Sequence, residues 1–163
     1  GQEGTAEDAA AAVAAAREAF ESWRRTRLED RFSAINRFAA LLKAREQDAA
    51  ALISCETGKP VWDALGEVAA MIGKAELSRR AYAERTPTRE QPAGPFTARV
   101  THRPHGVMAV LGPFNFPGHL PNGHIMPALL AGNTVVFKPS EQTPATAEFI
   151  VRLWREAGLP PGV

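Results

Sequence analysis

The stretch Val107–Pro139 reads VMAVLGPFNFPGHLPNGHIMPALLAGNTVVFKP and decides the fold of this chain of 163 residues. Its two apolar runs, Val107–Leu111 and Thr134–Lys138, are rich in Val and bounded by Gly, Pro or Asn, which is typical of strands buried on both faces. Pro117–Leu130 between them predicts a helix, closed by Ala131-Gly132-Asn133, where Gly or Asn supplies a left-handed C-cap. The stretch therefore predicts one right-handed β-α-β unit.

The carboxyl ends of these two strands are the expected site of chemistry. In open parallel sheets, ligands bind beyond the carboxyl ends of the strands. Here those ends are followed by the loops Gly112–Pro117 and Lys138–Glu141. We therefore expect these two loops to lie at one edge of the sheet and to carry the functional residues.

Both loops contain polar residues that allow two interpretations. The amide of Asn115 could donate to a developing oxyanion, which stabilises a transition state by about 2.7–4 kcal/mol per donor. From the loop alone, a turn Asn that bonds its own backbone is the favoured alternative. Lys138 and Glu141 could hold the ribose of a nucleotide, or they could be a solvated pair worth about 0–1 kcal/mol. The residues alone leave both possibilities open.

The composition is that of an ordinary globular chain, with 45% hydrophobic and 23% charged residues. Nineteen basic residues against eighteen acidic ones leave a net charge of +1, which gives no reason to expect a nucleic-acid partner or an acidic membrane. We see no signal peptide and no apolar run of membrane-spanning length. A single cysteine fits a reducing compartment, so we expect a cytoplasmic protein. Neither end looks like a natural terminus.

Residues 1–86 predict an N-terminal helical region. Four apolar patterns have helical spacing: one after a capping box at Thr5–Asp8, one over residues 28–42, one over about 48–56 and one over about 63–85. Gly58, followed by Pro60, is a stop signal for the third. We interpret the four as one packed helical layer.

Residues 87–106 predict a connector and an exposed strand, in a hairpin of the type that mediates oligomerisation. Thr86–Pro95 is polar and rich in Pro, whereas Thr97–Arg103 alternates as an exposed antiparallel strand does. After the β-α-β unit, Thr143 and Pro144 predict the N-cap and first residue of another helix. The chain is therefore of the α/β class: four helices, then β-α-β-α.

Cys55 and the histidines are weaker candidates for catalytic or metal-binding residues. Cys55 could be a nucleophile, but it lies in a helical pattern far from the strand-end loops, so we interpret it as a small core residue. His119 and His124 are five residues apart and do not share a helix face, so we expect no metal site. The dinucleotide fingerprint G-x-G-x-x-G is absent.

Three motifs in order, Gly112–Pro117, Ala131–Pro144 and Ala157–Val163, closely resemble the NAD(P)-dependent aldehyde dehydrogenases. Glu56–Pro60 matches the helical region of the same family, and the resemblance covers nearly all of the chain. The run Gly112–Ile125 is most similar to the branch of the family that acts in bacterial arginine degradation. The resemblance implies a helical layer followed by the first β-α-β-α half of a Rossmann-like cofactor domain, truncated, over residues 107–163.

The resemblance also implies a chemistry. An aldehyde forms a thiohemiacetal on a cysteine, hydride passes to the nicotinamide, and water releases the acid. Asn115 would supply the oxyanion-hole side chain, and Leu111, Gly112, Pro113 and Phe114 would line the cofactor. Lys138 and Glu141 would meet the adenosine ribose, and the hydroxyl of Ser140 beside them could donate a hydrogen bond to a phosphate of the cofactor. The nucleophilic cysteine and the general-base glutamate of the family lie beyond Val163, and the complete enzyme would be a homo-oligomer.

Further expectations concern the cofactor and the substrate channel. NAD is favoured over NADP, because the carboxylate of Glu141 would repel a 2′-phosphate. Phe114 replaces a tryptophan of most relatives, a mild change if its backbone binds the cofactor, and His124 replaces a common lysine. Gly123 replaces a bulky aromatic residue, which suggests a wider channel for a long, acidic aldehyde substrate. The alternative is a non-catalytic nucleotide-binding or assembly module.

Overall fold

The β-α-β unit is present in the computed structural model, which describes residues 4–163. Strands β3 (Val107–Leu111) and β4 (Thr134–Lys138) have the predicted bounds and pair in parallel, with Val107 opposite Thr134 and Leu111 opposite Lys138. Helix α5 (His119–Leu130) connects them and starts two residues later than predicted. Residues 1–3 of the predicted helical region lie outside the described residues.

The prediction that both strands are buried on both faces is wrong. In β3 only Val110 is buried, whereas Ala109 and Leu111 are exposed. The reason is that the sheet has two strands, with α5 against one face and α1 (Ala6–Trp23) against the other. At the outer edge of β4, the N–H of Val135 donates to the carbonyl of Val163 at 2.9 Å.

The end of α5 explains how the chain turns into β4. Gly132 has φ of +90°, so it supplies the predicted left-handed residue. The buried Asn133 then joins two segments: its Oδ1 accepts from the N–H groups of His105 and Gly106, at 2.7 and 3.0 Å. Its Nδ2 donates to the carbonyl of Ala128 at 3.2 Å. Asn133 therefore ties the helix end to the turn that leads into β3.

Three of the four predicted N-terminal helices form the helical layer over α5: α2 (Leu28–Ala44), α3 (Glu46–Thr57) and α4 (Val61–Arg85). Their buried faces share one core with α5 and with α6 (Pro144–Glu156). The rings of Phe38 and Trp154 stack with centroids 3.9 Å apart, which fixes α2 against α6.

The first helix does not belong to this layer, contrary to the prediction. Helix α1 lies on the opposite side of the sheet, and only Ala16 and Trp23 are buried on it. Its alanine-rich stripe offers little apolar area, so the buried Trp23 and two polar contacts hold it. The hydroxyl of Thr134 donates to the carbonyl of Ala16 at 2.8 Å, and Trp23 Nε1 donates to the carbonyl of Leu129 at 3.1 Å.

The predicted N-cap of α6 is only partly right. Thr143 occupies the N-cap position, but its buried hydroxyl has no partner among the described residues. The carboxylate of Glu56, at the end of α3, accepts from the N–H groups of Ala145 and Thr146, both at 2.8 Å. A carboxylate from another helix therefore caps α6, where the helix dipole favours a negative charge.

Two further predicted helix boundaries, the capping box at Thr5 and the left-handed Gly58, are confirmed.

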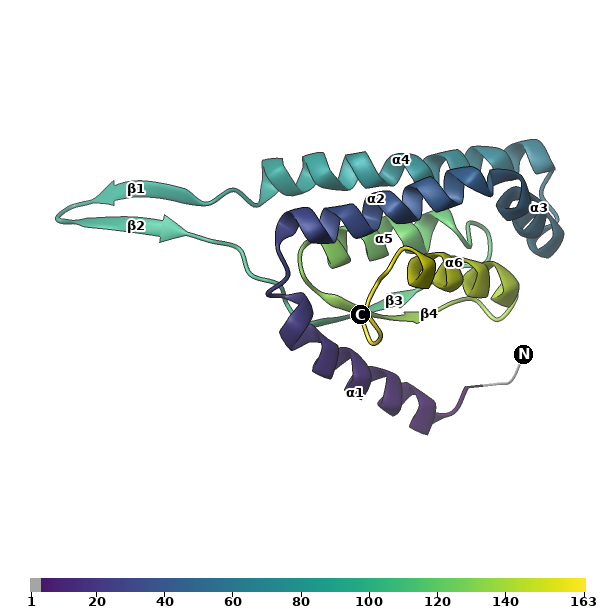
Figure 1. Ribbon diagram of the computed structural model, residues 1–163, viewed down its shortest axis with the longest axis horizontal. Helices are drawn as coiled ribbons and strands as arrows, with labels where there is room; N and C mark the ends of the chain where they lie inside the picture. The colour runs from purple at the N-terminus through teal and green to yellow at the C-terminus, as the bar shows by residue number, and fades with distance from the viewer. Residues whose placement is uncertain (1–3) are drawn as a thin grey trace.

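The segment before the sheet is a hairpin that projects from the body (Figure 1). Strand β1 (Arg89–Ala93) lies in what the sequence predicted as a connector, and it pairs antiparallel with β2 (Phe96–Val100). The second strand ends three residues earlier than predicted. Gly94 has φ of +62°, the conformation that the first central residue of a type II′ hairpin turn requires.

Asn133→Ala is expected to lower the free energy of unfolding by about 2–4 kcal/mol, because it leaves the N–H groups of His105 and Gly106 without their acceptor. Urea unfolding measures the change. Asn115→Ala removes an exposed amide that bonds no described residue, and it should change stability by less than about 0.5 kcal/mol. Equal effects of the two variants would contradict the role of Asn133.

Candidate active site at the strand-end loops

The two strand-end loops lie together, as the sequence predicted. The N–H of Gly112, the first residue after β3, donates to the carbonyl of Lys138, the last residue of β4, at 2.9 Å. This bond continues the parallel pairing by one residue. Gly112–Pro117 and Lys138–Glu141 therefore start from the same edge of the sheet.

The first loop presents apolar side chains to solvent. Leu111 and Phe114 are 76% and 53% exposed, and between them Gly112 and Pro113 are half-buried. Large exposed apolar groups, here at the end of β3 and in the loop that follows it, are a feature of binding sites. The part of the loop predicted to line a cofactor is accessible to one.

The second loop presents one exposed ion pair. Lys138 Nζ lies 3.1 Å from Glu141 Oε2, and their side chains are 65% and 78% exposed. The pKa of Glu141 lies below its ordinary value, because its own backbone N–H and then Lys138 stabilise the charged carboxylate. Ser140 differs from both: it is buried, and its hydroxyl oxygen accepts from the N–H of Gln142 at 3.2 Å.

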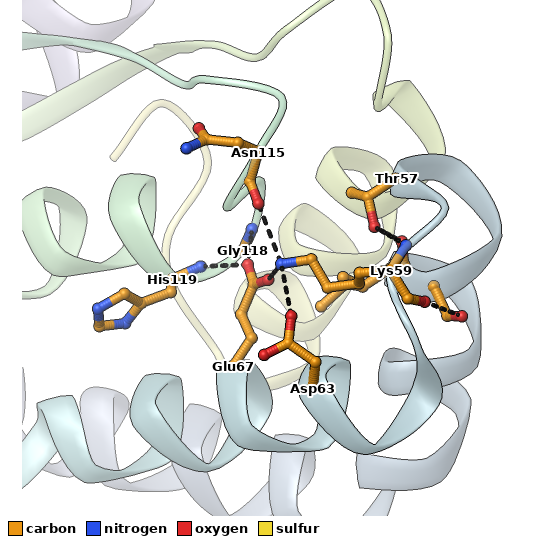
Figure 2. A network of polar contacts seen from close by, with 9 residues as sticks. Thr57, Lys59, Asp63, Glu67, Asn115, Gly118 and His119 are labelled. Atoms are coloured by element: carbon orange, nitrogen blue, oxygen red, sulfur yellow. Dashed lines mark hydrogen bonds and ion pairs between the residues drawn. The ribbon is translucent and has the colours of Figure 1, made fainter.

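Asn115 is exposed, and its side chain is free. Its amide makes no hydrogen bond to residues 4–163, so it is not engaged as a turn Asn that bonds its own backbone. Its backbone carbonyl accepts from Lys59 Nζ at 3.0 Å, and its amide points away from that lysine (Figure 2). The backbone of Asn115 is therefore held while its amide donors remain available.

A carboxylate that the sequence analysis missed anchors this loop. Glu67, on α4, has a fully buried side chain. Its Oε1 accepts from the N–H groups of Gly118 and His119, at 2.9 and 3.0 Å, where α5 begins (Figure 2). Its Oε2 lies 2.7 Å from Lys59 Nζ. Glu67 therefore caps α5 with a negative charge at the positive end of the helix dipole.

Lys59 connects this cap to the loop. Besides Glu67 and the carbonyl of Asn115, its ammonium lies 4.1 Å from the centroid of the Phe116 ring, a cation–π contact. Lys59 belongs to a sequence motif noted above, but nothing in that motif indicates this contact. The sequence does contain a signal for Glu67: it is a charged residue at helical spacing between Ala64 and Met71, on the face of α4 that is buried.

Two glycines, Gly112 in the loop and Gly118 at the N-cap of α5, lie where other side chains come close. A Cβ on Gly112 would lie 2.9 Å from Phe137 Cε2, and a Cβ on Gly118 would lie 2.6 Å from Met71 Sδ. Both distances are too short for a real contact. The absence of side chains at these positions lets the loop pack closely against β4 and α4.

The prediction that Cys55 is a small core residue is wrong, because Cys55 is exposed. The buried positions of α3 are Ala49, Ala50 and Ile53, and Cys55 follows Ile53 by two residues, about 200° around the helix. His124 is exposed as well. Within residues 4–163, no three His, Cys, Asp or Glu side chains come together as a metal site.

No helix within residues 4–163 is both long enough and apolar enough to cross a bilayer.

Comparison with known proteins gives consistent matches. The model of the aldehyde dehydrogenase family matches residues 1–163. An N-succinylglutamate 5-semialdehyde dehydrogenase of Yersinia pseudotuberculosis is 59% identical over 96% of this chain and 31% of that protein. One of Pseudomonas fluorescens is 55% identical over 100% of this chain and 33% of that protein. The chain thus spans about a third of the length of these relatives.

A solved structure agrees with the fold. The NADP-dependent glyceraldehyde-3-phosphate dehydrogenase of Bacillus halodurans, complexed with NADP, superposes with a TM-score of 0.91 at 30% identity. The match covers 97% of this chain and 34% of that one.

Glu67→Gln is expected to lower the free energy of unfolding by about 3–5 kcal/mol, because it leaves Lys59 buried without its counter-charge. Asp63→Asn is the matched control. Its carboxylate is 3.9 Å from the same ammonium and 43% exposed, so the loss should stay below about 1 kcal/mol. Chemical denaturation of both variants decides between them, and a control as damaging as Glu67→Gln would refute the anchoring role.

Proposed function

The chain belongs to the aldehyde dehydrogenase family, and we propose that it supplies the oxyanion donor and part of the cofactor site of an enzyme that oxidises an aldehyde to an acid. The observation that carries this proposal is the free amide of Asn115, on a loop whose backbone is held by Lys59 and Glu67. A donor fixed before the reaction stabilises a developing oxyanion without reorganisation at the moment of reaction.

The cofactor is the second part of the proposal. The family uses NAD or NADP, and the bound nicotinamide supplies the acceptor for hydride. The residues present fit such a group: Leu111 and Phe114 offer exposed apolar surface, and the exposed Lys138–Glu141 pair offers a donor and an acceptor for a ribose diol. Glu141 favours NAD, since its carboxylate would repel a 2′-phosphate. Ser140 contributes to the cofactor site by holding the turn of this loop, because its buried hydroxyl accepts from the N–H of Gln142.

The substrate is the third part. Relatives at 55–59% identity carry the name N-succinylglutamate 5-semialdehyde dehydrogenase, and we infer the same acidic semialdehyde for the enzyme that contains this chain. Gly123 supports this, because a glycine at this place in α5 adds no side chain of its own to the space beside α4, where Lys74 lies. A role in the cytoplasmic breakdown of arginine follows from that substrate.

A homo-oligomer is the fourth part. The β1–β2 hairpin projects from the body and has exposed apolar residues, with Phe96 at 76% and Val100 at 54% exposure. Both strands are edges, so the hairpin can pair with a second copy through backbone hydrogen bonds.

Asn115→Ala in the full-length enzyme is expected to lower kcat by about 10²–10³-fold, the cost of one oxyanion donor. The Kd for NAD should remain unchanged, since an amide that points at the substrate oxygen need not touch the cofactor. Steady-state kinetics and a cofactor titration measure the two quantities. Asn36→Ala, which removes an exposed amide on α2, is the control. An Asn115→Ala enzyme with wild-type kcat would exclude the role.

Glu141→Gln in the full-length enzyme is expected to improve kcat/KM with NADP relative to NAD. The change removes the repulsion of the 2′-phosphate and keeps an acceptor for the ribose. Glu148→Gln, an exposed carboxylate on α6, controls for the loss of one surface charge. A wild-type preference for NADP, or a cofactor ratio that does not move, would show that Glu141 does not discriminate.

A further inference from the structure

Lys74 is the lysine that pairs with no carboxylate in the part of the chain that the structure describes. Lys74, on α4, is half-buried, and it makes no ion pair or hydrogen bond with residues 4–163. The other three lysines each pair with a carboxylate: Lys43 with Glu46, Lys59 with Glu67 and Lys138 with Glu141. An unpaired, partly desolvated ammonium is costly, so a negative group that neutralises it would bind favourably.

The register between α4 and α5 determines where this charge lies. Glu67 contacts the first residues of α5, and one turn further the carbonyl of Met71 accepts from Asn122 Nδ2 at 3.3 Å. Next along α4, Lys74 lies against Gly123. A Cβ built on Gly123 would be 3.5 Å from Lys74 Cε and 3.7 Å from its Nζ. The ammonium therefore occupies the side of α5 that Gly123 leaves open.

His119 shares this side of α5, because it precedes Gly123 by four residues. Its pKa is lowered, first by burial and second by the charge of Lys74, while Glu67 acts in the opposite direction. A neutral imidazole offers one N–H donor and no charge. Its buried Nδ1 has no partner among the described residues. Lys74 therefore supplies the positive charge here, and His119 a polar group beside it.

The charge lies further along α5 than the loop that carries the proposed oxyanion donor. Gly123 is five residues beyond Gly118, the N-cap of α5, and this corresponds to about 7.5 Å along a helix axis. Asn115 lies on the loop that enters this same helix end. A substrate with its aldehyde at Asn115 and its carboxylate several bonds away would extend along α5 towards Lys74.

We propose that Lys74, which lies against Gly123, binds a carboxylate of the aldehyde substrate and thereby selects acidic aldehydes. This inference rests on the proposed function and assigns substrate selection to a residue outside the strand-end loops. Lys74 is then a specificity residue, and it takes no part in the transfer of hydride.

The test compares two aldehydes on the full-length enzyme: N-succinylglutamate 5-semialdehyde and the uncharged hexanal. Lys74→Met is expected to raise KM for the acidic aldehyde roughly 10–100-fold, the range for loss of a hydrogen bond between charged groups. KM for hexanal and both kcat values should change less than about twofold. Lys74→Arg should restore most of the affinity, since it keeps the charge, and Lys74→Gln should behave as Lys74→Met does.

Lys43→Met is the matched control, because it removes one lysine charge from an exposed pair with Glu46. It should leave both KM values unchanged. An unchanged KM for the acidic aldehyde in Lys74→Met and Lys74→Gln, or equal losses on both aldehydes, would overturn the inference alone. A wild-type enzyme that oxidises hexanal but not the acidic aldehyde would overturn the proposed substrate together with the inference.

Discussion

The buried carboxylate of Glu67 is the contact on which the rest of the candidate site depends. It satisfies two N–H groups at the start of α5, which would otherwise lack partners in the interior, and Lys59 neutralises its charge. Removing either partner leaves an uncompensated buried charge, which is far more costly than losing a surface pair. Because Lys59 also binds the carbonyl of Asn115, the same contact fixes the backbone from which the Asn115 amide projects.

The alignment of α4 with α5 extends this constraint along both helices. Met71 packs where Gly118 has no side chain, and Lys74 lies where Gly123 has none. Two lysines on this side of the molecule thus have different surroundings. Lys59 is nearly buried and fully paired, which suits a structural role. Lys74 is half-buried and unpaired within the described part of the chain, which suits a role in binding.

The β-α-β unit could be predicted from the sequence because its signals are local. Short Val-rich runs between Gly, Pro and Asn gave both strands with correct bounds, and helical spacing gave α2, α3 and α4. The contacts that were missed join residues far apart in the chain: Glu67 is 51 residues from Gly118, and Glu56 is 89 residues from Ala145. Strand β1 was missed because an exposed hairpin strand needs no apolar alternation, and the exposure of Cys55 depends on which face of α3 packs.

A crystal structure of the full-length enzyme with its acid product bound tests most directly whether the loop anchored by Glu67 presents Asn115 to the substrate. We expect Asn115 Nδ2 about 2.7–3.1 Å from a product oxygen at the reacting carbon, with the Lys59–Glu67 pair intact. A product oxygen held by other groups, with the Asn115 amide turned away from it, would contradict this arrangement.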